Sequence, residues 1–143
     1  MFDPVGILAS IAHNLSAQAQ EESYQECCGL LAGRNGLITR AFPATNAAIN
    51  PTTSYEIAIP QLFELMREIR AAGLEFLGIY HSHPNGKNEP SPRDIAWAYY
   101  PDAAYFILSP LADAPKPMRA FSIREGCVKE LEIQIVPPEG VTP

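Results

Sequence analysis

The chain has 143 residues, the usual length of one domain, and 47% of them are hydrophobic, so it can bury a continuous core without crosslinks. Ten lysines and arginines against 16 acidic residues give a formal net charge of −6, and no basic run could follow a phosphate backbone. We therefore expect no nucleic-acid partner. We find neither the roughly 20 consecutive apolar residues of a membrane span nor a signal peptide, which predicts a soluble, cytoplasmic protein with no membrane partner.

The three cysteines fit a reducing compartment better than a secreted disulfide framework. Two of them, Cys27 and Cys28, are adjacent, and the sequence has no C-x-x-C pair. They could form half of a metal site, but the pattern favours small buried hydrophobic residues. We assign them no chemistry.

The first predicted elements are a helix and a hairpin. Asp3 and Pro4 have the character of an N-cap and a first-turn proline, and apolar residues follow them at helical spacing. These apolar residues are Val5, Leu8, Ile11 and Leu15. Further on, Asn35-Gly36 lies between the apolar runs CCGLLAG and LITRAFPA, which predicts two antiparallel strands joined by a tight turn.

The centre of the chain predicts a second helix followed by a buried strand. The helix should begin at Pro60 and end before Gly73, because an apolar stripe runs between them and glycine suits the position just past a helix end. The stripe consists of Leu62, Phe63, Met66 and Ile69. The next segment, LEFLGIYHSHP, is a strand with two different faces. One face carries Leu77, Ile79, His81 and His83, and the other carries Phe76, Gly78 and Tyr80.

The remaining sequence predicts a stiff proline-rich loop, a short helix and further strands. The loop includes NGKNEP, the helix is PRDIAWAYY, and the strands are AYFILSP, MRAFSIREG and CVKELEIQIV. We expect a single domain over residues 1–136 and a flexible tail at 137–143. Together these elements predict a mixed α/β (α+β) fold, with strands in the middle and helices against them.

Two histidines and an aspartate form a candidate metal site. His81 and His83 are two residues apart on the predicted strand, so both imidazoles can point toward one ion. Asp94 follows eleven residues after His83, and the prolines between them stiffen a loop that could bring its carboxylate to the same point. This ligand set leaves a fourth position to water, as in hydrolytic zinc sites. Its hard ligands suit Zn²⁺ best, although iron or manganese could also bind.

Such a site also needs a general base, and a glutamate is the usual choice in zinc hydrolases. The candidates are Glu21, Glu22, Glu26, Glu56, Glu64, Glu68, Glu75 and Glu89. Only Glu26 adjoins a strongly apolar strand that could hold it in a fixed place. Local sequence alone does not decide among them.

Each of these residues also has a purely structural interpretation. Ser91 and Asp94 form a good helix start, with Ser91 as N-cap and Pro92 at the first helical position, and taken alone that interpretation is favoured. A single histidine at a strand end is more often a satisfied polar residue, and a lone glutamate is usually a solvated charge. None of these explains why two histidines on one strand face precede a stiff loop that ends in Ser-x-x-Asp.

The motif residues as a set resemble the H-x-H-P-x6-S-x-x-D signature of the JAMM (MPN+) metalloprotease family. They are His81-Ser82-His83-Pro84, followed after six residues by Ser91-Pro92-Arg93-Asp94. The match to the signature is complete, and the likeness extends from the first helix through YYPDAAYFILS. In the family an upstream glutamate precedes a small or apolar pair and a glycine at the start of a strand, and the segment that begins at Glu26 is similar. The resemblance therefore selects Glu26 as the general base.

The resemblance implies a fold, a reaction and a substrate class. The fold would be a curved mixed β-sheet sandwiched by helices, the JAMM/MPN (cytidine-deaminase-like) architecture. His81, His83 and Asp94 would bind Zn²⁺, Glu26 would act as general base, and Ser91 would donate a hydrogen bond to the developing oxyanion. The short chain resembles bacterial members that hydrolyse the bond after the C-terminal tail of a small ubiquitin-like sulfur-carrier protein, for example in cysteine biosynthesis. The resemblance also leaves room for a homodimer.

Other functions use the same motif. Some JAMM domains belong to peptidoglycan or phage-tail peptidases, but we see no such fusion partner here. Some MPN domains have lost their ligands and serve as non-catalytic scaffolds, whereas this chain keeps every motif residue. RadC-type proteins associated with DNA repair have a similar metal motif, but this acidic chain has no counterpart of their DNA-binding-like region.

Overall fold

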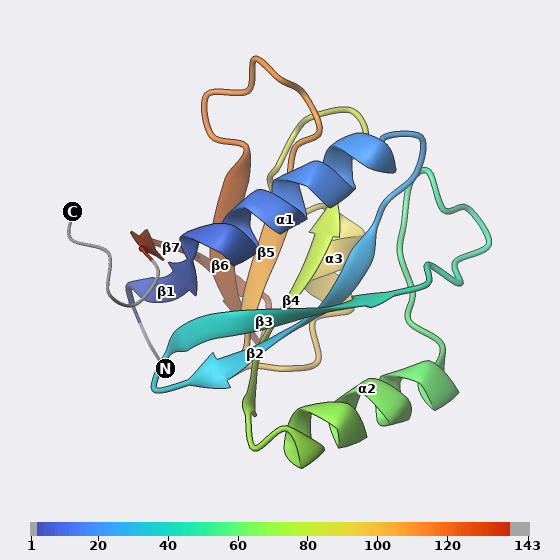
Figure 1. Cartoon of the computed structure of the whole chain (residues 1–143). Coiled ribbons are helices and arrows are strands. Elements are labelled where there is room, and N and C mark those ends of the chain that lie inside the picture. Colours follow the sequence, from blue (N-terminus) through green and yellow to red (C-terminus); the bar gives the residue numbers. More distant parts are fainter. Residues whose placement is uncertain (1–2, 138–143) are drawn as a thin grey trace.

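The computed structural model describes residues 3–137. One mixed sheet of eight strands forms the centre of this part of the chain (Figure 1). The strands are β1 (Val5–Leu8), β2 (Cys28–Arg34), β3 (Leu37–Ala44), β4 (Glu75–Ser82), β5 (Ala104–Leu108), β6 (Met118–Arg124), β7 (Cys127–Leu131) and β8 (Ile133–Val136). Their order across the sheet is β7-β6-β5-β4-β2-β3-β1-β8. The helices are α1 (Ala9–Glu21), α2 (Ile59–Ala71) and α3 (Pro92–Ala96). The predicted mixed α/β (α+β) fold is confirmed.

The sheet is strongly curved. β7 pairs with β6 at one edge and β8 pairs with β1 at the other, yet only Glu132 separates β7 from β8 along the chain. Because one residue spans at most about 3.6 Å, the two edges lie close together. The prediction of a single strand over CVKELEIQIV is therefore wrong. At Glu132 the chain leaves β6 and turns to β1, where its carbonyl accepts a hydrogen bond from the amide of Val5 (2.9 Å) and its amide donates to Asp3 Oδ1 (3.1 Å).

The N-terminal helix begins later than the sequence predicts. β1 runs parallel to both β3 and β8, and α1 begins only at Ala9. Val5 and Ile7 are fully buried and alternate with partly buried residues, which is the period of a strand. These β-branched residues gain more from pairing inside the sheet than from a first helical turn. The expectation that Asp3 and Pro4 begin the helix is wrong.

β2 and β3 form the predicted hairpin. Asn35 and Gly36 join them with φ angles of 53° and 75°, both in the left-handed region that a tight two-residue turn requires. β4 then pairs antiparallel with β2 and parallel with β5. The middle of the sheet therefore brings together the segment after Glu26 and the strand that contains His81.

Helices cover both faces of the sheet, as the resemblance implied (Figure 1). α1 packs through Leu15 and Ala19 on one hydrophobic cluster, and α2 packs through Leu65 and Ile69 on the other. Phe63, which the sequence assigned to the apolar stripe of α2, is instead 68% exposed. Leu65 replaces it because it lies one helical turn before Ile69 on the face that meets the sheet.

A β-bulge changes the predicted faces of β4. The register between β2 and β4 skips Leu77. Leu77 therefore packs in the cluster under α1 with Tyr80, whereas Ile79 packs in the cluster under α2 with Phe76. The predicted shared face of Leu77 and Ile79 is wrong, but the alternation after the bulge is regular up to His81.

Among the described residues, no helix is long and apolar enough to cross a membrane. The predicted single domain over residues 1–136 is compatible with one sheet that carries both clusters, and it stays a prediction. The tail predicted at 137–143 lies outside the described residues from 138 onward.

Candidate metal centre and active site

Three side chains that the sequence singled out meet at the end of β4. His81 lies in β4, His83 lies directly after it, and Asp94 lies in α3. The Nε2 atoms of the two histidines are 3.0 Å apart, and Asp94 Oδ2 lies 3.2 Å from that of His81 and 3.1 Å from that of His83. Tetrahedral ligands at about 2.0 to 2.1 Å from an ion would be about 3.3 to 3.4 Å apart. The three atoms are thus spaced like ligands of one ion.

Backbone hydrogen bonds hold the histidine segment against the segment after Glu26. The amide of His83 donates to the carbonyl of Leu108 (3.0 Å), and the amide of Ser82 donates to the carbonyl of Cys27 (3.1 Å). The amide of Cys27 in turn donates to Ser82 Oγ (2.9 Å). Cys27 and its neighbour Cys28 are buried and have free thiols, as the sequence predicted.

The hydrogen bonding of His83 fits a metal ligand. Its Nδ1 lies 2.6 Å from the carbonyl oxygen of Lys87, which can only accept, so Nδ1 carries a proton and Nε2 of the neutral ring presents a lone pair. That lone pair faces Asp94 Oδ2, which already accepts a hydrogen bond from the amide of Ser91. A proton on His81 Nε2 can satisfy only one of these two acceptors. A cation among the three atoms would satisfy all of them, so these residues fit a divalent metal ion.

The protonation states of Asp94 and His81 also suit a metal, whereas the raised pKa of His83 favours a protonated form whose proton an ion would have to displace. Burial lowers the pKa of His81. Burial lowers the pKa of His83 as well, but its hydrogen bonds to Asp94 and to the carbonyl of Lys87 outweigh that effect and raise it. Burial raises the pKa of Asp94, but the hydrogen bonds with His81 and His83 outweigh it and hold that pKa far below its usual range. Asp94 is therefore ionised and His81 is neutral near pH 7, which are the forms that bind metals.

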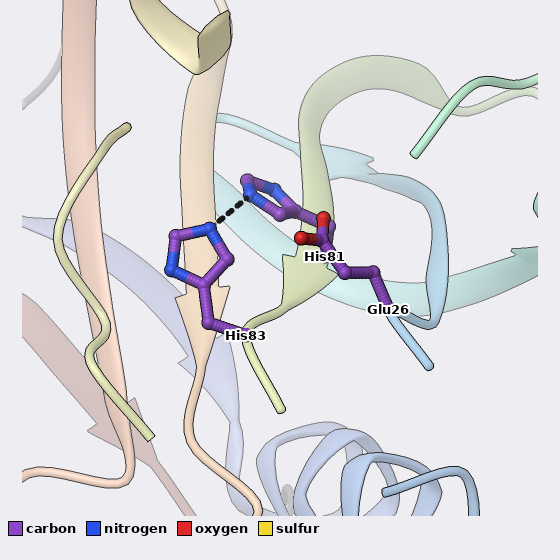
Figure 2. Close-up of side chains that lie close together, drawn as sticks. All are labelled: Glu26, His81 and His83. Atoms are coloured by element: carbon purple, nitrogen blue, oxygen red, sulfur yellow. Dashed lines mark hydrogen bonds between the residues drawn. The ribbon is translucent and has the colours of Figure 1, made fainter. Parts of the chain in front are cut away.

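Glu26 lies just before β2 and is only 4% exposed. Burial raises its pKa from 4.5 to about 7, while His83 lowers it and Asp94 raises it further. Within residues 3–137 its Oε1 has no hydrogen-bond partner. Figure 2 shows its carboxylate beside the ring of His81. A buried carboxylate with a pKa near neutrality beside a candidate metal site has the properties of a general base.

Two carboxylates compete for the role of third ligand. Ligand atoms of Glu26, His81 and His83 all lie within 4.8 Å of one another, whereas Asp94 Oδ2 lies within 3.2 Å of both histidine nitrogens. The shorter distances match a single coordination sphere. The longer separation is the one expected of a base that acts on a water between itself and the ion. The geometry therefore favours Asp94 as ligand and Glu26 as base.

The helix-cap interpretation of Ser91 and Asp94 is also correct. The amide of Asp94 donates to Ser91 Oγ (3.1 Å), and the amide of Ser91 donates to Asp94 Oδ2 (2.9 Å), which is a capping box at the start of α3. The same Oδ2 faces both histidines, so the cap and the metal ligand are compatible. The Ser91 hydroxyl accepts from Asp94 and keeps its own hydrogen for another acceptor.

The structure adds two features that no sequence motif indicated. Tyr55, in the connection between β3 and α2, stacks on His81 with ring centroids 4.3 Å apart and an interplanar angle of 22°. A cavity of about 440 Å³ also opens beside Asp94. Its walls are mostly aromatic and aliphatic and include Tyr55, Ile57, Leu62, Trp97, Tyr100 and Tyr105. The alternating apolar residues of SYEIAIP were the only hint of this wall.

One histidine at the end of a central strand, a second directly after it, a capped aspartate and a buried glutamate define a candidate mononuclear metal-hydrolase site. Residues 8–124 match the family model described as prokaryotic homologs of the JAB domain. The chain belongs to this family, and the predicted membership of the JAMM (MPN+) group is confirmed. The prediction that the chain is an enzyme, a peptidase among the hydrolases, is confirmed with it.

Three curated relatives are named as a peptidase, a probable conjugate-cleaving protease and a desampylase. The CysO-cysteine peptidase of Mycobacterium tuberculosis is 31% identical over 132 residues, which cover 91% of this chain and 90% of that protein. The probable TtuB-protein conjugate cleaving protease of Thermus thermophilus is 36% identical over 126 residues, or 88% of this chain and 78% of that protein. The desampylase of Haloferax volcanii is 37% identical over 87 residues, and this match spans 59% of the chain and only 63% of that protein.

Solved structures support the fold. A protein from Desulfitobacterium hafniense superposes with a TM-score of 0.82 at 29% identity, and the match covers 94% of both chains. A JAB1/MPN domain protein from Archaeoglobus fulgidus superposes with a TM-score of 0.61 at 17% identity, over 92% of this chain and 98% of that one. The curved mixed sheet with helices on both faces is thus the JAB1/MPN architecture that the resemblance implied.

Proposed function

We propose that the chain is a zinc-dependent peptidase that hydrolyses the bond after the C-terminal tail of a small ubiquitin-like sulfur-carrier protein. The observation that carries this proposal is the convergence of His81, His83 and Asp94 beside the buried carboxylate of Glu26. The relatives named for CysO-cysteine and for TtuB-protein conjugates support this class of substrate. Three free cysteines support a reducing compartment such as the cytoplasm.

The metal ligands in this proposal are Nε2 of His81, Nε2 of His83 and Oδ2 of Asp94. When bound, the zinc ion supplies a Lewis acid that polarises the scissile carbonyl and makes water more acidic. Two neutral imidazoles and one carboxylate do not cancel its double charge, unlike a set of thiolates. The hydrogen bonds with His81 and His83 keep Asp94 ionised, and the capping box fixes it in place before the ion arrives.

Glu26 moves the protons of the reaction. It takes a proton from the attacking water and returns that proton to the departing amine. Burial raises the pKa of Glu26 above its ordinary value, which makes the carboxylate a better proton acceptor than an exposed glutamate. The burial of Glu26 also shields its carboxylate from bulk water. No covalent intermediate is needed.

Ser91 stabilises the charge that develops on the carbonyl oxygen. Its hydroxyl oxygen is fixed by the amide of Asp94 (3.1 Å), and its hydrogen remains available to an oxyanion. Because this charge appears only as the carbonyl is attacked, the interaction favours the transition state over the substrate.

The cavity beside Asp94 supports an extended peptide tail as the substrate. It measures about 440 Å³ and leads from the candidate metal site to side chains that are strongly exposed, among them Ile59 (65%), Trp97 (46%) and Tyr99 (69%). Apolar walls of this kind suit a side chain from the tail, while small residues next to the scissile bond would let the tail reach the buried ligands. Peptidoglycan peptides remain the alternative substrate to be tested.

The metal site is tested by elemental analysis of the purified protein and its variants. We expect about one zinc per chain, lost in His83→Ala and Asp94→Ala and kept in Glu26→Gln, since only the first two remove proposed ligands. His13→Ala is the matched histidine control, because His13 is exposed on α1 and lies outside the proposed ligand set. A wild-type protein that binds no zinc when zinc is supplied would refute the hydrolase proposal.

The substrate is tested with a carrier-protein conjugate and with a peptidoglycan stem peptide. We expect the zinc-loaded protein to cleave a ubiquitin-like protein that carries one residue after its Gly-Gly end, as seen by the mass of the product. Glu26→Gln should bind zinc and cleave far more slowly. Cleavage of the stem peptide alone would replace the carrier by peptidoglycan as the substrate.

A further inference from the structure

The ring of His81 is held in place by a different contact from the ring of His83. His83 donates from Nδ1 to the carbonyl of Lys87 (2.6 Å). His81 is 1% exposed, and within the described residues its Nδ1 has no hydrogen-bond partner. Metal-binding histidines almost always have such a partner, which fixes the plane of the ring. For His81 the structure offers the stacked ring of Tyr55 instead, at 4.3 Å and 22°.

Tyr55 is held in place by the side chain of Asn46. Asn46 Nδ2 donates to the carbonyl of Ser54 (2.9 Å), and Asn46 Oδ1 accepts from the amide of Glu56 (3.2 Å). Ser54 and Glu56 are the two neighbours of Tyr55 in the chain. The carbonyl of Glu56 also accepts from the amide of Ala47, next to Asn46 (2.8 Å). One amide side chain therefore fixes the backbone on both sides of the stacking ring.

The same side chain reaches the candidate general base. Asn46 Nδ2 donates to the carbonyl of Glu26 (2.9 Å), and the amide of Glu26 donates to the carbonyl of Pro51 in the same connection (2.8 Å). Asn46 Oδ1 accepts a further bond from the amide of Ala48 (2.9 Å). Both donors and both lone pairs of the Asn46 amide are thus in use, so neither an aspartate nor an alanine could replace it.

We propose that Asn46 and Tyr55 form a positioning unit that fixes the metal ligand His81 and the general base Glu26 relative to each other. This inference rests on the proposed function, because it takes His81 as a metal ligand and Glu26 as the general base. Tyr55 acts through the ring of His81, so its loss weakens metal binding. Asn46 acts through the backbone of Glu26, so its loss lowers kcat even at saturating zinc, and because Asn46 also holds Tyr55, its loss weakens zinc binding as well.

The role of Tyr55 is tested by the zinc dissociation constant, measured by competition with a chromophoric chelator. Tyr55→Met keeps the bulk but loses the aromatic ring, and we expect the constant to rise about tenfold to a hundredfold, the usual effect of removing a group that orients a metal ligand. Tyr55→Phe keeps the ring and should stay within about threefold of the wild type. Equal constants in all three proteins, or an equal loss in both variants, would overturn the stacking role. The urea midpoints of the metal-free proteins show whether each variant folds.

The role of Asn46 is tested by steady-state kinetics at saturating zinc. Asn46→Ala should lower kcat about tenfold or more and leave KM nearly unchanged. Asn50→Ala is the matched control in the same connection, because within residues 3–137 the side chain of Asn50 makes no hydrogen bond. It should retain wild-type kcat.

A double variant separates this inference from the proposed function. If Asn46 acts through Glu26, adding Asn46→Ala to Glu26→Gln should not lower the residual rate further. A further loss of about tenfold in the double variant would overturn the inference. A Glu26→Gln variant with wild-type activity would instead refute the proposed base, while the zinc affinity of the Tyr55 variants would still report on the stacking.

Discussion

Burial of Glu26 makes the metal-free protein less stable at high pH, and Glu26→Gln should remove that effect. The folded-state pKa of Glu26 is about 7 and the ordinary value is 4.5. Because the folded state holds the proton more tightly, its stability falls as the pH rises from about 4.5 to 7 and then levels off. The difference, 7 − 4.5 = 2.5, corresponds to about 3 kcal/mol at 1.36 kcal/mol per pKa unit. The carboxylate is 4% exposed, so solvent screens little of this cost.

Urea unfolding of the two chelator-treated proteins between pH 4 and pH 8.5 measures this difference. Glutamine has nearly the same shape without the charge, so Glu26→Gln should gain up to about 3 kcal/mol relative to the wild type between pH 4.5 and pH 8. His83 and Asp94 interact electrostatically with Glu26, so the difference between the two proteins reports the titration of Glu26 together with its coupling to these neighbours. A stability difference that does not change with pH would refute the buried, raised pKa of Glu26.

A bound divalent cation should change the same pH dependence in a defined direction. Its positive charge favours the ionised form of Glu26 and therefore lowers the pKa of that carboxylate from about 7. In the zinc-loaded proteins the stability difference should therefore shrink. The acidic limb of the kcat/KM profile should then fall below pH 7, because Glu26 must be deprotonated to act as base.

Other variants test the packing and the remaining roles. Ser91→Ala should retain zinc, lose about 1 kcal/mol of unfolding free energy with the cap, and lose about 10² to 10³ in kcat with the oxyanion donor. Leu65→Ala should cost about 2 to 5 kcal/mol in urea unfolding, whereas Phe63→Ala, at an exposed position, should stay within about 0.5 kcal/mol. Gly29→Ala would place a Cβ atom 2.5 Å from the hydroxyl of Tyr80, which should lower the thermal midpoint by an amount equivalent to about 1 to 3 kcal/mol.

Local sequence signals predicted most elements because the chain marks their ends clearly. Asn35-Gly36 predicted the hairpin, since both residues tolerate the positive φ that the turn needs, and Gly73, with a φ of 71°, marked the end of α2. The errors all involve partners that are distant in sequence. β1 is a strand because β3 and β8 flank it, and the division between β7 and β8 depends on the opposite edge of the sheet. The bulge at Leu77 likewise depends on its pairing with β2.

Some residues of the candidate site could be predicted from the sequence and others could not, again because sequence patterns do not show contacts between distant segments. His81 and His83 are close in sequence, so their shared direction follows from the period of a strand. Glu26 is far away in sequence, and only the resemblance selected it among many glutamates. Tyr55 and Asn46 carry no motif of their own, because one acts through a ring face and the other through backbone carbonyls and amides. Such contacts depend on the path of a connection that sequence patterns do not describe.

The helix-cap and metal-ligand interpretations of Ser91 and Asp94 do not exclude each other. A capping box requires an acceptor side chain at the N-cap and another three positions later, and Ser-x-x-Asp supplies both. The carboxylate that accepts the Ser91 amide is held by that bond, so it need not be ordered again when an ion arrives. The same bond leaves its Oδ2 facing His81 and His83. In the proposed site, the start of α3 therefore fixes the ligand Asp94 in advance through the backbone amide of Ser91, and this bond remains in Ser91→Ala, which is why that variant should retain zinc.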